Sequence, residues 1–219
     1  MKPPLLKIEH LVKRFGGLAT VNHCNFEIAK NSITALIGPN GAGKTTMFDL
    51  ITGVLEHDSG EIFFKGNPLG HLPAYRRSRL GIARTFQAIR IFPELTALEN
   101  IMHAFPENRE SLLDCFRPFK KWQAQRKHRA FALLEKIHLH EKAHTLAGSL
   151  SYGQQKLLEI MRAVATGAEL FLLDEPAAGV NRTMLHTIIA LIKQLHVDGK
   201  TVVIVEHDMG FVMELSERV

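Results

Sequence analysis

The sequence has few cysteines and no long apolar run, and these absences restrict the kind of protein it encodes. Cys24 and Cys115 are far apart and show no C-x-x-C spacing, which excludes a disulfide framework and a cysteine metal site. The longest apolar runs, such as Ile188 to Ile192, are far shorter than the about 20 residues of a membrane-spanning helix. No apolar run follows the N-terminal residues 1–4, so we expect no signal peptide. The pattern is typical of a cytosolic protein with reduced thiols.

No low-complexity stretch, internal repeat or flexible linker divides the chain. Apolar residues make up 46% and charged residues 22% of the sequence, which is ordinary for a globular protein and excludes a disordered one. At about 150 residues per domain, the length predicts one large domain or one domain with an inserted subdomain. The net charge of +5 suits an anionic partner such as nucleotide, nucleic acid or lipid headgroups, and it selects none of them.

Short apolar segments alternate with segments of helical periodicity over most of the chain. This pattern predicts an α/β domain with a buried parallel sheet, since strands covered on both faces are apolar throughout. The expected strands are 8–15 (an edge strand), 25–29, 33–37, 61–64, 82–87, 170–173 and 201–205, and the expected helices are 44–52, 152–166 and 182–196. Residues 88–150 show a different residue pattern, which is helical and predicts a helical insertion.

A glycine-rich segment at residues 38–45 satisfies the pattern G-x-x-x-x-G-K-[ST] between a predicted strand and a predicted helix. Glycines let the chain curl so that successive backbone N–H groups face one anion, and the following helix adds its positive N-terminal end. Lys44 can reach the β- and γ-phosphates, and the Thr45 hydroxyl can ligate Mg²⁺. The predicted phosphate site consists of Gly38, Pro39, Asn40, Gly41, Ala42, Gly43, Lys44, Thr45 and Thr46.

Two adjacent carboxylates, Asp174 and Glu175, follow the apolar strand at 170–173. Ligands collect at the carboxyl edge of a parallel sheet. Asp174 can hold Mg²⁺ there through water, and Glu175, which points the other way, can orient or deprotonate an attacking water. Together with the phosphate loop, this acidic strand end predicts a P-loop nucleoside triphosphatase.

Residues 150–154, Leu-Ser-Tyr-Gly-Gln, open a predicted helix shortly before the acidic strand. They resemble the LSGGQ signature of ABC-type ATPases, with Tyr152 in place of the first glycine. In that family the signature is a second phosphate-binding surface, and it acts across a dimer on nucleotide held by the partner's phosphate loop. The resemblance therefore implies ATP contacts from Ser151, Gly153 and Gln154.

Further residues match positions of the same family. Gln87 matches the Q-loop glutamine, a Mg²⁺ and water contact, and His207 matches the switch histidine that contacts the γ-phosphate. Phe15 lies where the family places an aromatic residue that stacks on adenine, and ordinary packing stays an alternative for it. Residues 178–181 stand where the D-loop should be, with Asn181 instead of the usual aspartate.

The likeness is closer to one branch of the family. Residues 83–87, 151–155 and 174–181 look like the ATPase subunits of branched-chain amino acid importers, and related urea or amide importers carry similar segments. Members of this branch usually continue beyond the switch histidine with further strands and a glycine turn, whereas this sequence ends at Val219. The resemblance therefore does not extend to the finish of the sheet.

The resemblance implies a P-loop α/β core of the ABC ATPase type with an antiparallel β subdomain and a helical subdomain. The nucleotide-binding core with its β subdomain would span 1–87 and 151–219, and the helical subdomain 88–150. The implied function is ATP hydrolysis that powers a solute importer. Lys44, Gln87, Glu175 and His207 are then the catalytic residues, and Thr45, Gln87 and Asp174 hold Mg²⁺.

The implied partners are ATP, a second ABC ATPase subunit that is identical or different, and integral membrane permease subunits. The protein would then be peripheral, at the cytoplasmic face of the inner membrane. A soluble ABC ATPase acting on ribosomes or DNA normally carries two cassettes or a long coiled-coil insertion, and this chain has neither, so no nucleic acid partner is expected. A nucleotide-binding regulator without turnover would be expected to lack Glu175, which is present.

Overall fold

The computed structural model describes residues 4–106 and 119–219, which form two compact units. The core unit holds the residues up to 87 together with 168–178 and 192–219, and the helical unit holds 88–167 and 179–191. The expected fold class is confirmed, because the chain combines an antiparallel sheet, a parallel sheet and inserted helices.

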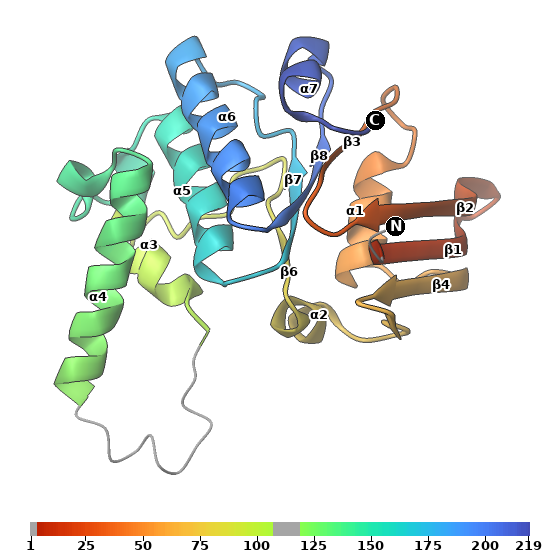
Figure 1. Cartoon of the computed structure of the whole chain (residues 1–219), viewed down its shortest axis with the longest axis horizontal. Helices are drawn as coiled ribbons and strands as arrows, with labels where there is room; N and C mark the ends of the chain where they lie inside the picture. Colours follow the sequence, from red (N-terminus) through yellow and green to blue (C-terminus); the bar gives the residue numbers. More distant parts are fainter. Residues whose placement is uncertain (1–3, 107–118) are drawn as a thin grey trace. The chain divides into compact units, whose positions relative to one another are not determined.

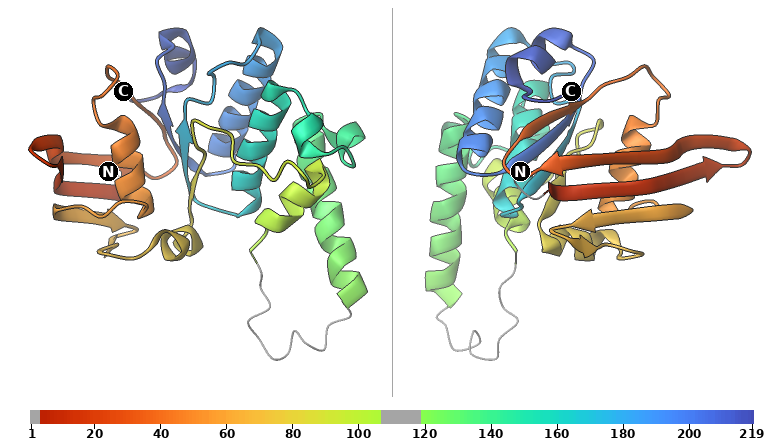
Figure 2. Two further views of the ribbon diagram at one scale, coloured as in Figure 1. Left: turned by 180° about the vertical axis from the view of Figure 1, so that it is seen from behind. Right: turned by 45° about the vertical axis from the view of Figure 1, so that its right-hand side comes forward.

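The first sheet of the core unit is antiparallel, in the order β2-β1-β4-β5. Its strands are β1 (Pro4–Phe15), β2 (Leu18–Ala29), β4 (Ser59–Phe64) and β5 (Asn67–Pro68). Gly16, with a φ of 57°, turns β1 into β2, and both views of Figure 2 show this long hairpin. The prediction of an edge strand at 8–15 is wrong, because β1 pairs with β2 on one side and with β4 on the other.

The second sheet of the core unit is parallel, in the order β3-β8-β7-β6. Its strands are β3 (Ile33–Leu36), β6 (Ile82–Arg84), β7 (Leu170–Asp174) and β8 (Thr201–Val205). Strands β7 and β8 are buried along their whole length, as expected of apolar strands covered on both faces. Because parallel strands all end at one edge, the segments that follow them leave the sheet together.

Helix α1 (Lys44–Thr52) packs against both sheets of the core unit (Figure 1). Its side chains Met47, Phe48, Leu50 and Ile51 are buried, and they share one hydrophobic core with apolar residues of the antiparallel and the parallel strands. Two short helices, α2 (Ala74–Leu80) and α7 (Met209–Leu215), also belong to the core unit, and the sequence pattern did not predict them.

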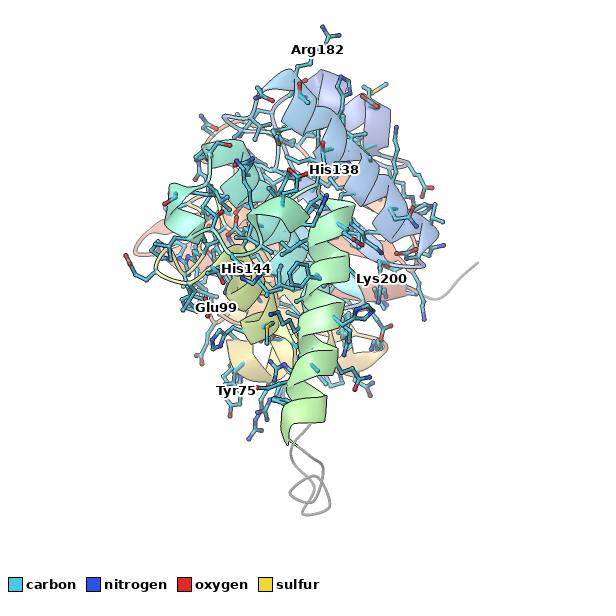
Figure 3. The ribbon with its side chains drawn as sticks, turned by 90° about the vertical axis from the view of Figure 1, so that its left-hand side faces the viewer. Tyr75, Glu99, His138, His144, Arg182 and Lys200 are labelled. Carbon is cyan, nitrogen blue, oxygen red and sulfur yellow. The ribbon has the colours of Figure 1, made fainter. Side chains whose placement is uncertain are left out.

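The helical unit is built around α3 (Ala97–Ala104), α4 (Phe119–Lys136) and α5 (Tyr152–Ala165), with the first part of α6 (Arg182–Val197) and the short turns η2 (His140–Lys142) and η3 (Ala147–Ser149). Helix α3 packs against α4 and α5. Figure 3 views this unit from the side of α4, with Glu99 of α3 labelled. Within 4–106 and 119–219, no helix is long and apolar enough to cross a membrane.

Candidate functional site

The phosphate loop connects β3 to α1 and requires glycine at two positions. Gly41 and Gly43 have φ angles of 83° and 82°, in the left-handed region that favours glycine. At Gly43 a Cβ atom would also lie 2.6 Å from the carbonyl oxygen of Thr20, so backbone excludes any side chain there. The loop therefore has the tight curl that a phosphate cradle needs.

Lys44, the first residue of α1, lies within this loop. Its Nζ donates to the carbonyl oxygens of Gly38 and Pro39 at 2.7 and 2.9 Å, and the residue is buried. An ammonium group has three N–H donors. Two of them hold the lysine across the loop, so one is left for an anion.

A polar cavity of about 530 Å³ lies at the phosphate loop. It is lined by Thr20, Asn40, Gly41, Ala42, Gly43, Lys44, Thr45, Thr46, Gln87, Glu175 and His207. All of these except Thr20 were predicted from the sequence. The structure therefore brings predicted residues from after β3, β6, β7 and β8 to one cavity.

Glu175 stands between Gln87 and His207. Its Oε1 lies 3.2 Å from Nε2 of His207, and its Oε2 accepts a hydrogen bond from Nε2 of Gln87 at 3.3 Å. The backbone of Glu175 has a φ of 48°, which is costly for a residue with a side chain, and such strain collects at functional sites. Its N–H donates to the carbonyl oxygen of Val205 at 2.9 Å, so neighbouring backbone holds this conformation.

Asp174, the last residue of β7, forms a buried ion pair with Arg84. The aspartate is 2% exposed, and its Oδ2 accepts from Nη2 of Arg84 at 3.1 Å. Burial raises the pKa of Asp174, and the guanidinium opposes that shift. Arg84 also donates to Asp49 of α1, so one cation ties the acidic strand end to the phosphate-loop helix.

Sequence reasoning gave no role to Arg84 or to Glu206, which are both charged residues at the ends of apolar strands. Glu206 follows β8 and is 4% exposed. For Glu206, a charge directly after the uniformly apolar strand β8 was the available signal, because that position lies at the ligand-binding edge of the sheet. Arg84 lay inside the strand predicted at 82–87, so no such signal marked it.

Three residues were predicted to hold Mg²⁺, and their chemistry fits that ion. The Thr45 hydroxyl and the Gln87 amide line the same cavity, and Gln87 uses its nitrogen on Glu175, which leaves its oxygen for a cation. Asp174 lies outside this lining, one residue before Glu175, so it would act through water. Oxygen donors with intervening water are the ligands that Mg²⁺ prefers.

Phe15 lies apart from the polar cavity. It ends β1, is 48% exposed and stands outside the lining of the cavity. Nζ of Lys13 lies 5.7 Å from the centre of its ring. The exposed ring offers a face for stacking, as the family resemblance implies.

The signature segment begins α5 in the helical unit. Ser151 caps the helix, because its Oγ accepts from the Gln154 N–H at 3.4 Å while Gln154 Oε1 accepts from the Ser151 N–H at 3.2 Å. Gly153 is buried, and a Cβ atom there would lie 2.9 Å from Met184. Tyr152, which replaces a glycine of the family pattern, is half exposed. Ser151, Gly153 and Gln154 thus lie at a helix N-terminus, which attracts anions.

Asn181, which stands where the family pattern has an aspartate, caps the start of helix α6. Its Oδ1 accepts a hydrogen bond from the N–H of Met184 at 2.9 Å, at the start of α6. Asparagine and aspartate are equally good N-caps. The departure from the family pattern therefore leaves the start of this helix intact.

Comparisons with known proteins agree with this arrangement. The ABC transporter family model matches residues 21–178. The chain is 40% identical over 228 residues to the high-affinity branched-chain amino acid transport ATP-binding protein LivG of Escherichia coli, which covers 100% of this chain and 88% of LivG. A crystal structure of a nucleotide-free ATP-binding cassette from an ABC transporter matches with a TM-score of 0.85 and 32% identity, over 98% of this chain and 86% of that one. A dimeric post-hydrolysis state of an ATP-binding cassette, bound to ADP and phosphate, matches with a TM-score of 0.79 and 26% identity, over 96% of this chain and 91% of that one.

Proposed function

This chain belongs to the ABC transporter family as an ATPase that couples ATP hydrolysis to transport, and we propose that it powers the import of branched-chain amino acids through separate permease subunits. The full-length likeness to LivG supports this solute class. The observation that supports the catalytic part is one cavity in which Glu175, Gln87 and His207 meet the phosphate loop. A related importer of urea or amides is the alternative to be tested.

The geometry and the family resemblance together support the following proposed roles for the site residues. Lys44 and the loop N–H groups balance the charge that develops on the transferred phosphate. Mg²⁺, when bound by Thr45, Gln87 and, through water, Asp174, supplies positive charge to the β- and γ-phosphate oxygens. Glu175 orients or deprotonates the attacking water. His207 contacts Glu175 in this structure, and its proposed role is to contact the γ-phosphate of bound ATP.

ABC ATPases work as dimers and associate with permease subunits. We propose that Ser151, Gly153 and Gln154 contact nucleotide held by residues 38–46 of a second cassette, and that Phe15 stacks on adenine. Residues 88–150 are the proposed helical subdomain, and 1–87 with 151–219 the nucleotide-binding core; in the division into compact units, 151–167 and 179–191 join the helical unit. Binding to a permease would place the protein peripherally, at the cytoplasmic face of the membrane.

Replacing Glu175 with glutamine tests the catalytic assignment. Glutamine keeps the shape of the side chain but cannot accept a proton, so turnover should fall by about 100-fold or more while ATP binding is retained. Size-exclusion chromatography with ATP and Mg²⁺ should show a trapped dimer. Glu169→Gln is the matched control, because Glu169 directly precedes β7 whereas Glu175 directly follows it. This variant should behave as wild type. Near-wild-type turnover of Glu175→Gln would remove this residue from the catalytic role.

Transport in proteoliposomes tests the solute class. The cassette would be reconstituted with its permease subunits and binding protein, and ATP-dependent uptake of leucine, isoleucine and valine compared with uptake of urea and acetamide. We expect uptake of the three amino acids. Uptake of urea or acetamide alone would refute the solute assignment and leave the ATPase assignment intact.

A further inference from the structure

Glu206 lies where the two turns that carry Glu175 and His207 leave the parallel sheet. It follows directly after β8, and Asp174, which ends β7, pairs with Val205, which ends β8. The turn at 175–178 and the turn at 206–208 therefore start side by side, from neighbouring strand ends.

The carboxylate of Glu206 joins these two turns. Its Oε1 accepts from the N–H of Ala177 at 2.7 Å, and its Oε2 accepts from the N–H of His207 at 3.2 Å. The residue is 4% exposed, so water competes little for these bonds. Burial raises the pKa of Glu206, and the backbone N–H groups of Ala177, His207 and Asp208 oppose that shift.

Each turn is fixed further by its own backbone. The N–H of Ala178 donates to the carbonyl oxygen of Glu175 at 3.2 Å, which closes a turn over residues 175–178. Ala177 lies within this turn, so its bond to Glu206 holds the turn that begins at Glu175. On the other turn, Glu206 bonds the N–H of His207 itself. His207 Nε2 and Glu175 Oε1, which lie 3.2 Å apart, are therefore carried by two backbone segments that one buried carboxylate bonds.

We propose that Glu206 is a positioning residue for ATP hydrolysis, which sets the approach of His207 to Glu175 by tying their two turns together. The proposal rests on the roles that the proposed function gives to Glu175 and His207. Glu206 is outside the lining of the polar cavity, so it acts through its neighbours and not on nucleotide.

The first test is Glu206→Gln. The amide keeps one acceptor oxygen, but its NH₂ group faces one of the two backbone N–H donors, so one bond is lost. We expect kcat to fall about 10- to 100-fold, the range typical for loss of a residue that orients a group of the site, with little change in KM for ATP. Glu169→Gln is again the control of the same chemistry, and it should leave kcat unchanged. An unchanged kcat in Glu206→Gln, or a raised KM alone, would overturn the proposal.

A double-mutant cycle separates positioning from general structural support. In a His207→Ala background the same Glu206→Gln change should lower the single-turnover rate by a much smaller factor, since the imidazole to be positioned is gone. An equal factor in both backgrounds would refute the proposal. If Glu206→Gln does not fold, Glu206→Asp keeps the charge with shorter reach, and the same cycle applies. Wild-type turnover of His207→Ala would instead refute the role of His207 in the proposed function.

Discussion

Replacing Arg77 with methionine should strongly destabilise the core unit, because this guanidinium donates hydrogen bonds to carbonyl oxygens at the C-terminal end of α1, the helix that follows the phosphate loop. Arg77 is 2% exposed, and its Nη1 donates to the carbonyl oxygens of Leu50 and Ile51 at 2.7 and 3.0 Å. These oxygens lie in the last turn of α1, where a cation is favoured by the helix dipole, and the Leu50 oxygen also accepts from the N–H of the C-cap Gly53 at 3.3 Å. Its Nε and Nη2 donate to Leu72 and Gly70, both at 2.7 Å.

The size of the effect follows from these contacts. Methionine keeps much of the apolar stem of arginine but offers no donor, so four carbonyl oxygens lose a hydrogen bond, of which the Leu50 oxygen keeps a second one from Gly53. A buried polar group left unsatisfied costs about 1–3 kcal/mol. Part of this cost is offset, because the variant has no buried charge to desolvate. Burial lowers the pKa of Arg77, which reflects that desolvation. The net loss is about 3–5 kcal/mol, out of a typical stability of about 5–15 kcal/mol.

Thermal unfolding followed by circular dichroism at 222 nm measures this loss. At about 2–4 °C per kcal/mol, the midpoint of Arg77→Met should fall by about 10 °C. Arg76→Met, at the exposed neighbour on α2, is the control and should change stability by less than about 0.5 kcal/mol. Arg77→Lys should recover only part of the loss, since an ammonium lacks the planar fork of donors. Equal midpoints for Arg77→Met and Arg76→Met would refute the reasoning.

Two further predictions concern the helical unit and the assembly. Thr96→Ala removes the capping box of α3 and should cost about 1 kcal/mol in urea unfolding. Hydrogen bonds from the backbone N–H and the hydroxyl of Thr96 lower the pKa of Glu99, so their contribution is present above the ordinary pKa of about 4.3 and is lost as the pH falls through the folded value. The alanine variant keeps the backbone bond and loses the hydroxyl bond. The cost of Thr96→Ala should therefore be larger at pH 7 than at about pH 3, and an equal cost would contradict this. ATPase activity should rise faster than linearly with protein concentration, because each site needs Ser151 and Gly153 of a second cassette; constant specific activity of a monomer would exclude that arrangement.

Elements with a uniform environment could be predicted from the sequence. The strand expected at 201–205 is β8 and the helix expected at 44–52 is α1, with the same bounds. The apolar run of β8 is buried on both faces, and Gly43 and Gly53 mark the ends of α1 with left-handed backbone. The sequence of β1 does not show how many strands pair with it. Residue alternation indicates which face of a strand is buried, not whether one or both of its edges are hydrogen-bonded.

Three of the missed features, helix α2, Arg84 and Glu206, share one physical cause. Helix α2 has the sequence AYRRSRL, in which the buried side chain is Arg77, so its pattern gives no apolar stripe. Arg84 and Glu206 are likewise charged residues whose partners lie far away in the sequence. A buried charge is stable only with partners that the tertiary fold supplies, and local sequence does not name those partners.

The sequence predicted which residues belong to the site, but not that they already contact one another. Lys44 holds loop carbonyls, Glu175 holds His207 and Gln87, and Ser151 is bonded to Gln154. Where phosphate takes over a group that is already bonded, a hydrogen bond within the protein is exchanged for one to phosphate, and only the difference contributes to affinity. In return, few side chains have to be ordered on binding, which lowers the entropic cost. The same bonds that limit the affinity of one cassette for ATP hold its catalytic groups in place before the nucleotide arrives.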